Sequence, residues 1–212
     1  MVNSYQPTSL TLALDIRAKE SVTPYAGGTD IMIKPDENAT YLFLNKIEDM
    51  KNIIEDEEYI RIGASCTFTD IIESELTPDI LKEAASEIAA PAIRNLGTVG
   101  GNICNGSAKG DSSLIFFVAN SKLRLASCRG ERVIPITEFY LGRKKTSLQS
   151  DELLVEILMS KTGLTNYYYK KVGARNALAI ARVSFAATIN VVDTKIVNCS
   201  TAFGAVSDII IR

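Results

Sequence analysis

Two short glycine segments constrain this chain more than any other feature of its sequence. The first reads Ala26-Gly27-Gly28-Thr29-Asp30, and the second, about seventy residues later, reads Thr98-Val99-Gly100-Gly101-Asn102. A Gly-Gly pair lacks two β-carbons and permits positive φ, so backbone amides can turn toward one point and approach an anion closely. One such pair also fits an ordinary turn. Two pairs, each with a small polar neighbour, predict a cradle for a long ligand with two negative charges, such as a dinucleotide diphosphate.

Charge and hydropathy exclude two classes of protein. The net charge is −2, which gives no reason to expect a nucleic-acid partner. No apolar run approaches the ~20 residues of a membrane helix. The N-terminus, residues 1–7, lacks a basic region followed by an apolar stretch, which is the mark of a secretion signal. These features predict a cytoplasmic protein that does not bind membranes.

The chain has no histidine. It therefore lacks the usual general base near neutral pH, the commonest metal ligand and the usual residue for covalent flavin attachment. Its four cysteines, Cys66, Cys104, Cys128 and Cys199, form no Cys-x-x-Cys pair, so we expect buried reduced thiols and no metal site. If the chain takes part in catalysis, a cofactor must supply the reactive atoms.

Capping residues and apolar spacing predict the elements of the first 160 residues. Thr8 or Ser9 caps a first helix that ends before Thr23. A second helix begins at Thr77-Pro78 and ends at Pro91, and Asp111 caps a third over residues 114–119. The strand candidates are residues 24–26, 41–44 and 153–159, with hairpins over residues 51–62 and 122–136.

From Tyr167 onward the pattern is that of three strands, over residues 167–172, 182–192 and 196–203. The middle stretch alternates, and one of its faces is apolar: Val183, Phe185, Ala187, Ile189 and Val191. In a strand, residues two apart share a face, so we expect this apolar face to be the packed one.

Longer motifs accompany the glycine segments in a fixed order. They are Ile62-Gly63-Ala64 with Thr67 and Thr69; residues 93–102 with Gly110-Asp111; Phe139-Tyr140 with Gly142, Arg143 and Thr146; Asp151-Glu152-Leu153-Leu154; and residues 171–175 leading into Ile180-Ala181. In the residues of these motifs and in their order, the chain resembles the FAD-binding (medium) subunit of the molybdenum hydroxylases, the xanthine dehydrogenase and carbon monoxide dehydrogenase flavoprotein family. The resemblance covers nearly the whole chain.

The resemblance implies an α+β protein with a vanillyl-alcohol-oxidase (PCMH) type FAD-binding fold of two subdomains, residues 1–55 and 56–162. A β-rich C-terminal domain of the carbon monoxide dehydrogenase flavoprotein type would follow over residues 163–212. In the family this domain continues as helices packed on the sheet. We therefore expect a truncated domain here, with its sheet covered by a partner, by oligomerisation or not at all.

The resemblance also implies non-covalent FAD and a set of residues that hold it. In the first segment the amides of Gly27, Gly28, Thr29 and Asp30 would donate to the diphosphate, Ala26 and Ile31 would border it, and Pro24 and Tyr25 would approach the nucleotide. In the second, Thr98, Val99, Gly100, Gly101 and Asn102 would lie on the other side of the diphosphate or along the ribityl chain. The two segments would thus present opposed sets of neutral donors.

Four further positions carry two interpretations each. Asp111 matches an acidic ligand of the cofactor hydroxyls but also fits a helix cap, and one carboxylate can do both. Ile88, with Ala89 beside it, and Leu154 would pack on the cofactor, although ordinary core packing explains them equally well. Lys171 would lie near the flavin ring, where a cation stabilises the reduced flavin, or it is a solvated strand lysine like Lys170. Neighbouring strand residues face opposite ways, so only one of these lysines can point inward, and we choose Lys171.

The activity implied by the resemblance is an electron relay without a catalytic side chain of its own. Molybdopterin and [2Fe-2S] clusters would sit on partner subunits, and FAD would pass electrons to NAD⁺ or another acceptor. The chain departs from the family between residues 103 and 110, where Ser-Pro is common, and it lacks the cluster-binding cysteine insertion of one relative. A self-sufficient FAD-dependent oxidase or dehydrogenase and an inactive fragment remain as alternatives.

Overall fold

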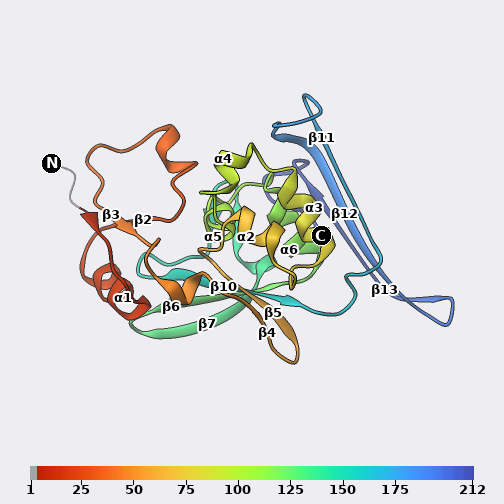
Figure 1. Cartoon of the computed structure of the whole chain (residues 1–212), viewed down its shortest axis with the longest axis horizontal. Helices are drawn as coiled ribbons and strands as arrows, with labels where there is room; N and C mark the ends of the chain where they lie inside the picture. The colour runs from red at the N-terminus through yellow and green to blue at the C-terminus, as the bar shows by residue number, and fades with distance from the viewer. Residues whose placement is uncertain (1–3) are drawn as a thin grey trace.

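Three larger β-sheets surround a central group of short helices in the computed structural model, which describes residues 4–212 (Figure 1). The first sheet has the order β1-β3-β2, and its strands are parallel: β1 (Ser4–Tyr5), β2 (Thr23–Tyr25) and β3 (Tyr41–Phe43). Helix α1 (Leu10–Lys19) joins β1 to β2. As predicted, Ser9 caps α1, and its side chain accepts a hydrogen bond from the Leu12 amide at 3.3 Å.

The second sheet is antiparallel, with the order β4-β5-β10-β6-β7. Its strands are β4 (Ile53–Glu55), β5 (Tyr59–Gly63), β6 (Lys122–Ser127), β7 (Gly130–Pro135) and β10 (Leu153–Ser160). Both predicted hairpins are confirmed. Strand β4 pairs with β5, so Ile53 already belongs to the second sheet. The limit of the first subdomain at residue 55 stays a prediction.

Five short helices lie between the sheets: α2 (Phe68–Glu73), α3 (Asp79–Ser86), α4 (Pro91–Arg94), α5 (Val99–Cys104) and α6 (Asp111–Val118). Two predicted helix boundaries are wrong. Helix α3 has Pro78 rather than Thr77 at its cap, and Pro91 begins α4 instead of ending α3. Proline has no N–H to donate and a φ suited to the first helical turn, so it stands at a helix start.

The third sheet has the order β11-β12-β13 and is antiparallel: β11 (Tyr167–Gly173), β12 (Ala181–Val192) and β13 (Lys195–Gly204). Figure 1 shows it at the right of the molecule, and its inner face packs on α6. The remaining elements are the strand pair β8 (Tyr140–Gly142) and β9 (Lys145–Thr146), and 3-10 helices at Ile31–Ile33, Glu48–Met50 and Ile136–Glu138.

The face of β12 that packs inward is the opposite of the predicted one. Ser184, Ala186 and Thr188 are buried, whereas Val183 and Val191 are exposed. The reason lies in α6, where all eight residues are buried and most are large and apolar. Because this helix supplies the bulk of the interface, the strands beneath it need small side chains. The apolar face of the sheet therefore points outward.

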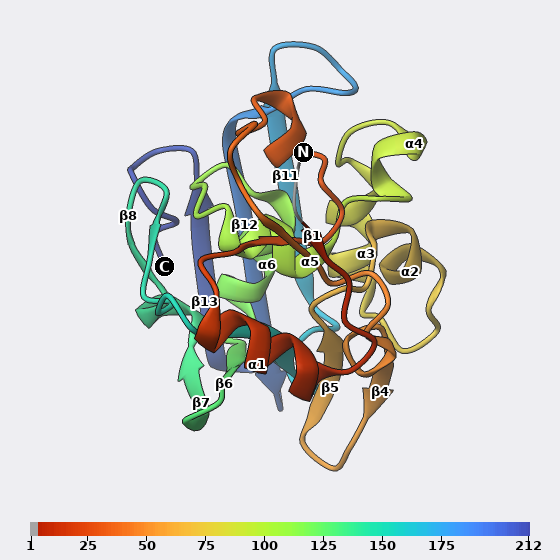
Figure 2. The same cartoon turned by 90° about the vertical axis from the view of Figure 1, so that its left-hand side faces the viewer.

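Figure 1 shows the N-terminal sheet at the left of the molecule and the helical group in the middle, and Figure 2 shows α1 crossing in front of β6. One apolar core runs through the molecule, with Phe116, Phe117 and Phe139 among its largest buried side chains. Among residues 4–212, no helix has the length and apolar character needed to cross a bilayer.

Candidate cofactor cleft

The two glycine segments line one cleft of about 530 Å³ between the first sheet and the helical group. Most residues predicted to hold the cofactor lie on its wall: Pro24, Ala26, Gly27, Gly28, Thr29, Asp30, Ile31, Ile88, Thr98, Gly100, Gly101, Asn102 and Leu154. Segments about seventy residues apart in the sequence are thus brought together. The other four predicted residues, Tyr25, Val99, Asp111 and Lys171, lie elsewhere.

Gly27 and Gly28 shape the first segment and its contact with the residues just before the second. A β-carbon on Gly27 would overlap the carbonyl of Leu96, so only glycine lets the first segment pack against the residues just before the second. Gly28 has a φ of +71°, and a side chain there would also overlap the Tyr25 ring beneath it. Both positions therefore require glycine for steric reasons, independently of any ligand.

The first segment presents free backbone donors. Within the described residues, the amides of Gly27, Gly28, Thr29 and Asp30 have no hydrogen-bond acceptor. The next turn is closed by the Met32 amide, which donates to the Gly28 carbonyl at 3.0 Å. Successive unpaired amides in a left-handed turn form a concave site for an anion. The segment thus has the donor arrangement that a diphosphate requires.

The second segment differs from the prediction of an opposed set of amides. It forms the start of α5, where Thr98 caps the helix and its Oγ1 accepts from the Gly101 amide at 3.1 Å. The amides of Val99 and Gly100 donate to the carbonyls of Cys66 and Ala64 at 3.0 and 2.9 Å. These donors are already used inside the protein, so the expectation that both segments offer free amides is wrong.

The second segment leaves space for a ligand beside Gly101 and presents one side-chain donor, Asn102. A β-carbon on Gly101 would meet only Thr98 Oγ1, at 3.0 Å, so the wall at Gly101 can be approached closely. Asn102 Oδ1 accepts from the hydroxyls of Ser112 and Ser113 at 2.9 and 3.3 Å. That orientation leaves the Asn102 Nδ2 group without a partner among the described residues. Val99, by contrast, points into the core and is fully buried.

Tyr25 belongs to an adjoining hollow of about 620 Å³ that shares Ala26, Gly27, Ser65 and Thr98 with the cleft. Its ring packs on Phe43 and Tyr41, with centroids 4.8 and 5.7 Å apart. Tyr25 therefore supports Gly28 from below.

Asp111 and Lys171 form a buried ion pair instead of lining the cleft. The Lys171 Nζ lies 2.7 Å from Asp111 Oδ2, and the two side chains are 7% and 8% exposed. The same Nζ donates to the Glu87 carbonyl at 2.9 Å. Lys171 is thus the inward-facing member of its pair, since Lys170 is exposed. Asp111 is the first residue of α6 and makes no capping hydrogen bond.

Burial dominates the electrostatics of this ion pair. It raises the pKa of the Asp111 carboxyl, although Lys171 opposes the change. Burial and the charge of Asp111 also raise the pKa of the Tyr169 hydroxyl. Both Asp111 Oδ1 and the Tyr169 hydroxyl are buried without a hydrogen-bond partner in the described structure. One carboxylate oxygen of the pair and the Tyr169 hydroxyl therefore lack the hydrogen bonds that buried polar atoms usually make.

The ion pair adjoins the cleft through the segment that carries Ile88. Arg94 Nη1 donates to the carbonyls of Ile88 and Ala89 at 3.0 and 2.8 Å. These bonds hold Ala89 at a φ of +44°, which a residue with a β-carbon rarely adopts. Ile88 is thereby fixed on the cleft wall, one residue after the carbonyl that Lys171 contacts.

Sequence reasoning missed several residues of the wall, among them Arg17, Ser65, Phe68, Cys104, Leu148 and Leu153. Ser65 directly follows the Ile62-Gly63-Ala64 motif, so that motif extends one residue further into the site. Cys104, Cys128 and Cys199 are exposed free thiols, which corrects the prediction that all four cysteines are buried. Cys104 opens onto the cleft.

The residues present fit FAD. A row of free amides and a close-approach glycine suit a diphosphate, and apolar side chains on the same wall, such as Leu44, Ile88 and Leu154, suit a flat ring system. The volume of the cleft lies in the range of small-molecule sites. FAD combines flat ring systems with a diphosphate.

The fold and the cleft define a cofactor-binding protein of the α+β class in which a glycine segment that follows a strand meets one that begins a helix. Residues 1–159 match the family described as the FAD binding domain in molybdopterin dehydrogenase, and the chain belongs to that family. It is an FAD-binding subunit of a molybdenum hydroxylase-like oxidoreductase.

Named relatives agree with this assignment. The chain is 33% identical over 200 residues to the xanthine dehydrogenase FAD-binding subunit of Escherichia coli O157:H7, covering 88% of this chain and 68% of the relative. It is 32% identical over 185 residues to the nicotinate dehydrogenase FAD-subunit of Eubacterium barkeri, covering 79% and 60%. The crystal structure of the cyanide-inactivated Cu,Mo-CO dehydrogenase matches with a TM-score of 0.93 at 25% identity, covering 99% of this chain and 77% of that one.

Proposed function

We propose that this chain holds FAD between its two glycine segments and passes electrons from iron–sulfur clusters on one partner subunit to NAD⁺ or another acceptor. A second partner would carry molybdopterin and oxidise the substrate. The observation that carries the proposal is the meeting of residues 26–31 with Thr98 and residues 100–102 on one cleft, with four free amides on one side. The names of the relatives, which include FAD subunits of xanthine and nicotinate dehydrogenases, support the same role.

Different residues of the cleft would contact different parts of FAD. The amides of residues 27–30 would donate to the diphosphate, and Asn102 Nδ2 would add a side-chain donor. Gly101 would allow close approach, while Ile88 and Leu154 would pack on the ring systems. When bound, FAD supplies a carrier that exchanges electrons singly with metal clusters and in pairs with organic acceptors.

The Asp111–Lys171 pair would tune this cofactor rather than bind it. A positive charge held beside the flavin stabilises the negative charge that reduction adds. Lys171 does not line the cleft, but it contacts the Glu87 carbonyl, one residue before Ile88 on the cleft wall, and its charge would act on the cofactor across that segment. Asp111 fixes the position of the ammonium group and reduces its net effect.

The assembly would be cytoplasmic. The chain would consist of subdomains 1–55 and 56–162 and a C-terminal domain over 163–212. It would have no substrate of its own beyond the electron acceptor.

Purification of the tagged chain together with its native partners tests this function. We expect iron, molybdenum and FAD in the isolated complex, and reduction of the bound FAD when the substrate of the molybdenum subunit is added. Acceptors are then compared by the rate at which each reoxidises that FAD. A chain that binds FAD, carries no iron or molybdenum partner and is reduced by a substrate of its own would contradict the proposal and identify a self-sufficient oxidase or dehydrogenase.

A further inference from the structure

Arg17 is the positively charged side chain on the wall of the cleft. It comes from α1 and is half-buried, and no other arginine or lysine lines the cleft within the described residues. Two of its donors are used for local structure: Nη1 donates to the Val22 carbonyl, and Nε donates to the Glu152 carbonyl at 3.3 Å. The side chain is thus fixed between the chain that leads into β2 and the start of β10.

The remaining donors of Arg17 are free. A guanidinium group has five N–H bonds, and Nη2 has no acceptor among the described residues. Because Nε and Nη1 are held by carbonyl oxygens, the orientation of the planar group is set before any ligand arrives. A fixed fork with spare donors is the arrangement that recognises phosphate oxygens.

The charge of Arg17 is not neutralised within the described structure. No carboxylate forms an ion pair with it, and Asp151, whose charge acts on it most, is bound by Arg129 at 2.8 and 2.9 Å. Cys104 lines the same cleft, but it carries a thiol and not a carboxylate. Asp30 lines the same cleft without an ion pair to Arg17. Partial burial lowers the pKa of Arg17, which is the mark of a cation that has lost part of its hydration.

A half-buried charge without a counter-ion is unfavourable unless a ligand supplies one. The cleft that Arg17 lines also carries the free amides of residues 27–30, which suit a dianion. We propose that Arg17 is a cationic ligand of the FAD diphosphate and adds an ionic contact to the neutral donors of the first glycine segment. This inference rests on the proposed placement of FAD in the cleft.

Titration of the apo-protein with FAD, followed by quenching of flavin fluorescence at several salt concentrations, tests the inference. We expect Arg17→Gln to weaken FAD binding about tenfold or more, as loss of a charge-assisted hydrogen bond does. The same variant should reduce the dependence of the dissociation constant on salt, since salt screens charge pairs and not neutral hydrogen bonds. Arg17→Lys keeps the charge and should keep most of that salt dependence.

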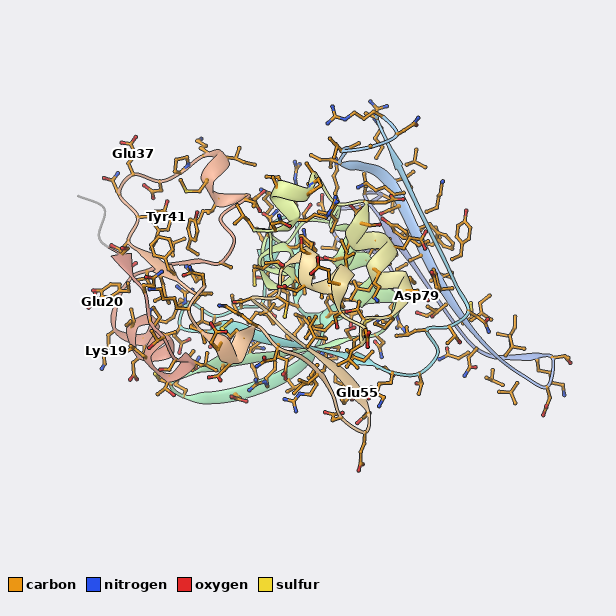
Figure 3. The ribbon with its side chains drawn as sticks, in the orientation of Figure 1. Lys19, Glu20, Glu37, Tyr41, Glu55 and Asp79 are labelled. Atoms are coloured by element: carbon orange, nitrogen blue, oxygen red, sulfur yellow. The ribbon has the colours of Figure 1, made fainter. Side chains whose placement is uncertain are left out.

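Lys19→Gln is the matched control. Lys19 lies on the same helix with the same charge, and Figure 3 shows it at the outer edge of the molecule. We expect it to bind FAD as the unchanged protein does. Arg17→Gln binding FAD like the control, or binding it more weakly with an unchanged salt dependence, would overturn the inference and leave Arg17 a structural residue. If the unchanged protein itself binds no FAD, the proposed placement fails instead.

Discussion

At the scale of single residues, the glycines of the cleft have separable tasks. Gly27 permits contact with the residues just before the second segment, Gly28 permits the left-handed turn, and Gly101 leaves the wall open. The sequence revealed the glycine pairs but not this division, because each task depends on which atoms of distant segments come close. The sequence also could not show that the amides of Val99 and Gly100 donate inside the protein, because their acceptors lie more than thirty residues away in the chain.

Gly28→Ala tests the first of these positions. The added β-carbon meets an unfavourable φ and the Tyr25 ring together, so we expect a loss of about 2 kcal/mol in the free energy of unfolding and about tenfold weaker FAD binding. Gly163→Ala is the control, because Gly163 has a φ of +76° and open space around it. That variant should lose only about 1 kcal/mol and bind FAD normally. Equal effects of the two variants on FAD affinity would argue against a role of Gly28 in the cleft.

Lys171→Met tests the role of the ion pair. Removing the lysine leaves Asp111 buried without its partner, so we expect a loss of about 3 kcal/mol in stability. The variant should still bind FAD, but with a lower reduction potential, because a positive charge beside the flavin has been removed. Lys170→Met, at the exposed neighbouring position, should change neither property. A reduction potential unchanged by Lys171→Met would refute the tuning role.

At the scale of elements, the hairpins, the strands and the Ser9 cap could be predicted because they depend on neighbours in the sequence, whereas the predicted caps at Thr77 and Asp111 are wrong. The inward face of β12 could not, because it depends on α6. Alternation in β12 marked two faces correctly, but hydrophobicity alone does not say which face a helix of large side chains will cover. In the structure the small residues lie beneath α6 and the larger apolar ones lie outside. The alternating pattern therefore predicted the two-residue period of β12 correctly and predicted wrongly which face packs inward.

The reversed face can be tested with neighbouring alanines. Ala186 is fully buried under the helices, so Ala186→Leu overpacks the interface and should cost about 2 kcal/mol. Ala187 is adjacent, lies on the outer face and is only half-buried, so Ala187→Leu should change stability by less than about 0.5 kcal/mol. Urea unfolding of both variants measures the difference. A larger loss for Ala187→Leu would restore the original assignment of the faces.

The start of β10 predicts a dependence of stability on pH. Glu152 is buried and accepts from Arg132 at 2.7 and 2.8 Å and from the Gln149 amide at 2.8 Å. Arg132 in particular lowers the pKa of Glu152. A carboxyl whose pKa is lower in the folded state stabilises the protein above its unfolded pKa, about 4.3, and loses that contribution as the pH falls through the folded value.

Glu152→Gln should therefore cost about 2 kcal/mol at pH 7 and make stability less sensitive to acid below about pH 4.5. Glu57→Gln, at an exposed position, should leave both unchanged. Unfolding followed from pH 7 to pH 3 measures the two effects. A pH profile of Glu152→Gln that parallels that of the unchanged protein would show that this carboxylate does not stabilise the folded state.

At the scale of the whole molecule, the cleft exists because two sheets and a helical group meet. The first segment follows a strand of the parallel sheet, and the second begins a helix that packs beside the antiparallel sheet (Figure 1). The sequence could predict that both segments line one site and, through its family motifs, that the chain belongs to a family of FAD-binding subunits. It could not predict Arg17, because no local pattern distinguishes an arginine that faces a cleft from one on an outer helical surface. Sites of this kind are assembled by tertiary structure.

A crystal structure of the chain with FAD bound tests the central claim most directly. We predict that the diphosphate lies between the two segments, with its oxygens accepting from the amides of residues 27–30 and with Gly101 facing it on the other side. Density for the diphosphate outside this cleft, or the amides of residues 27–30 left without any contact to the cofactor, would contradict the account.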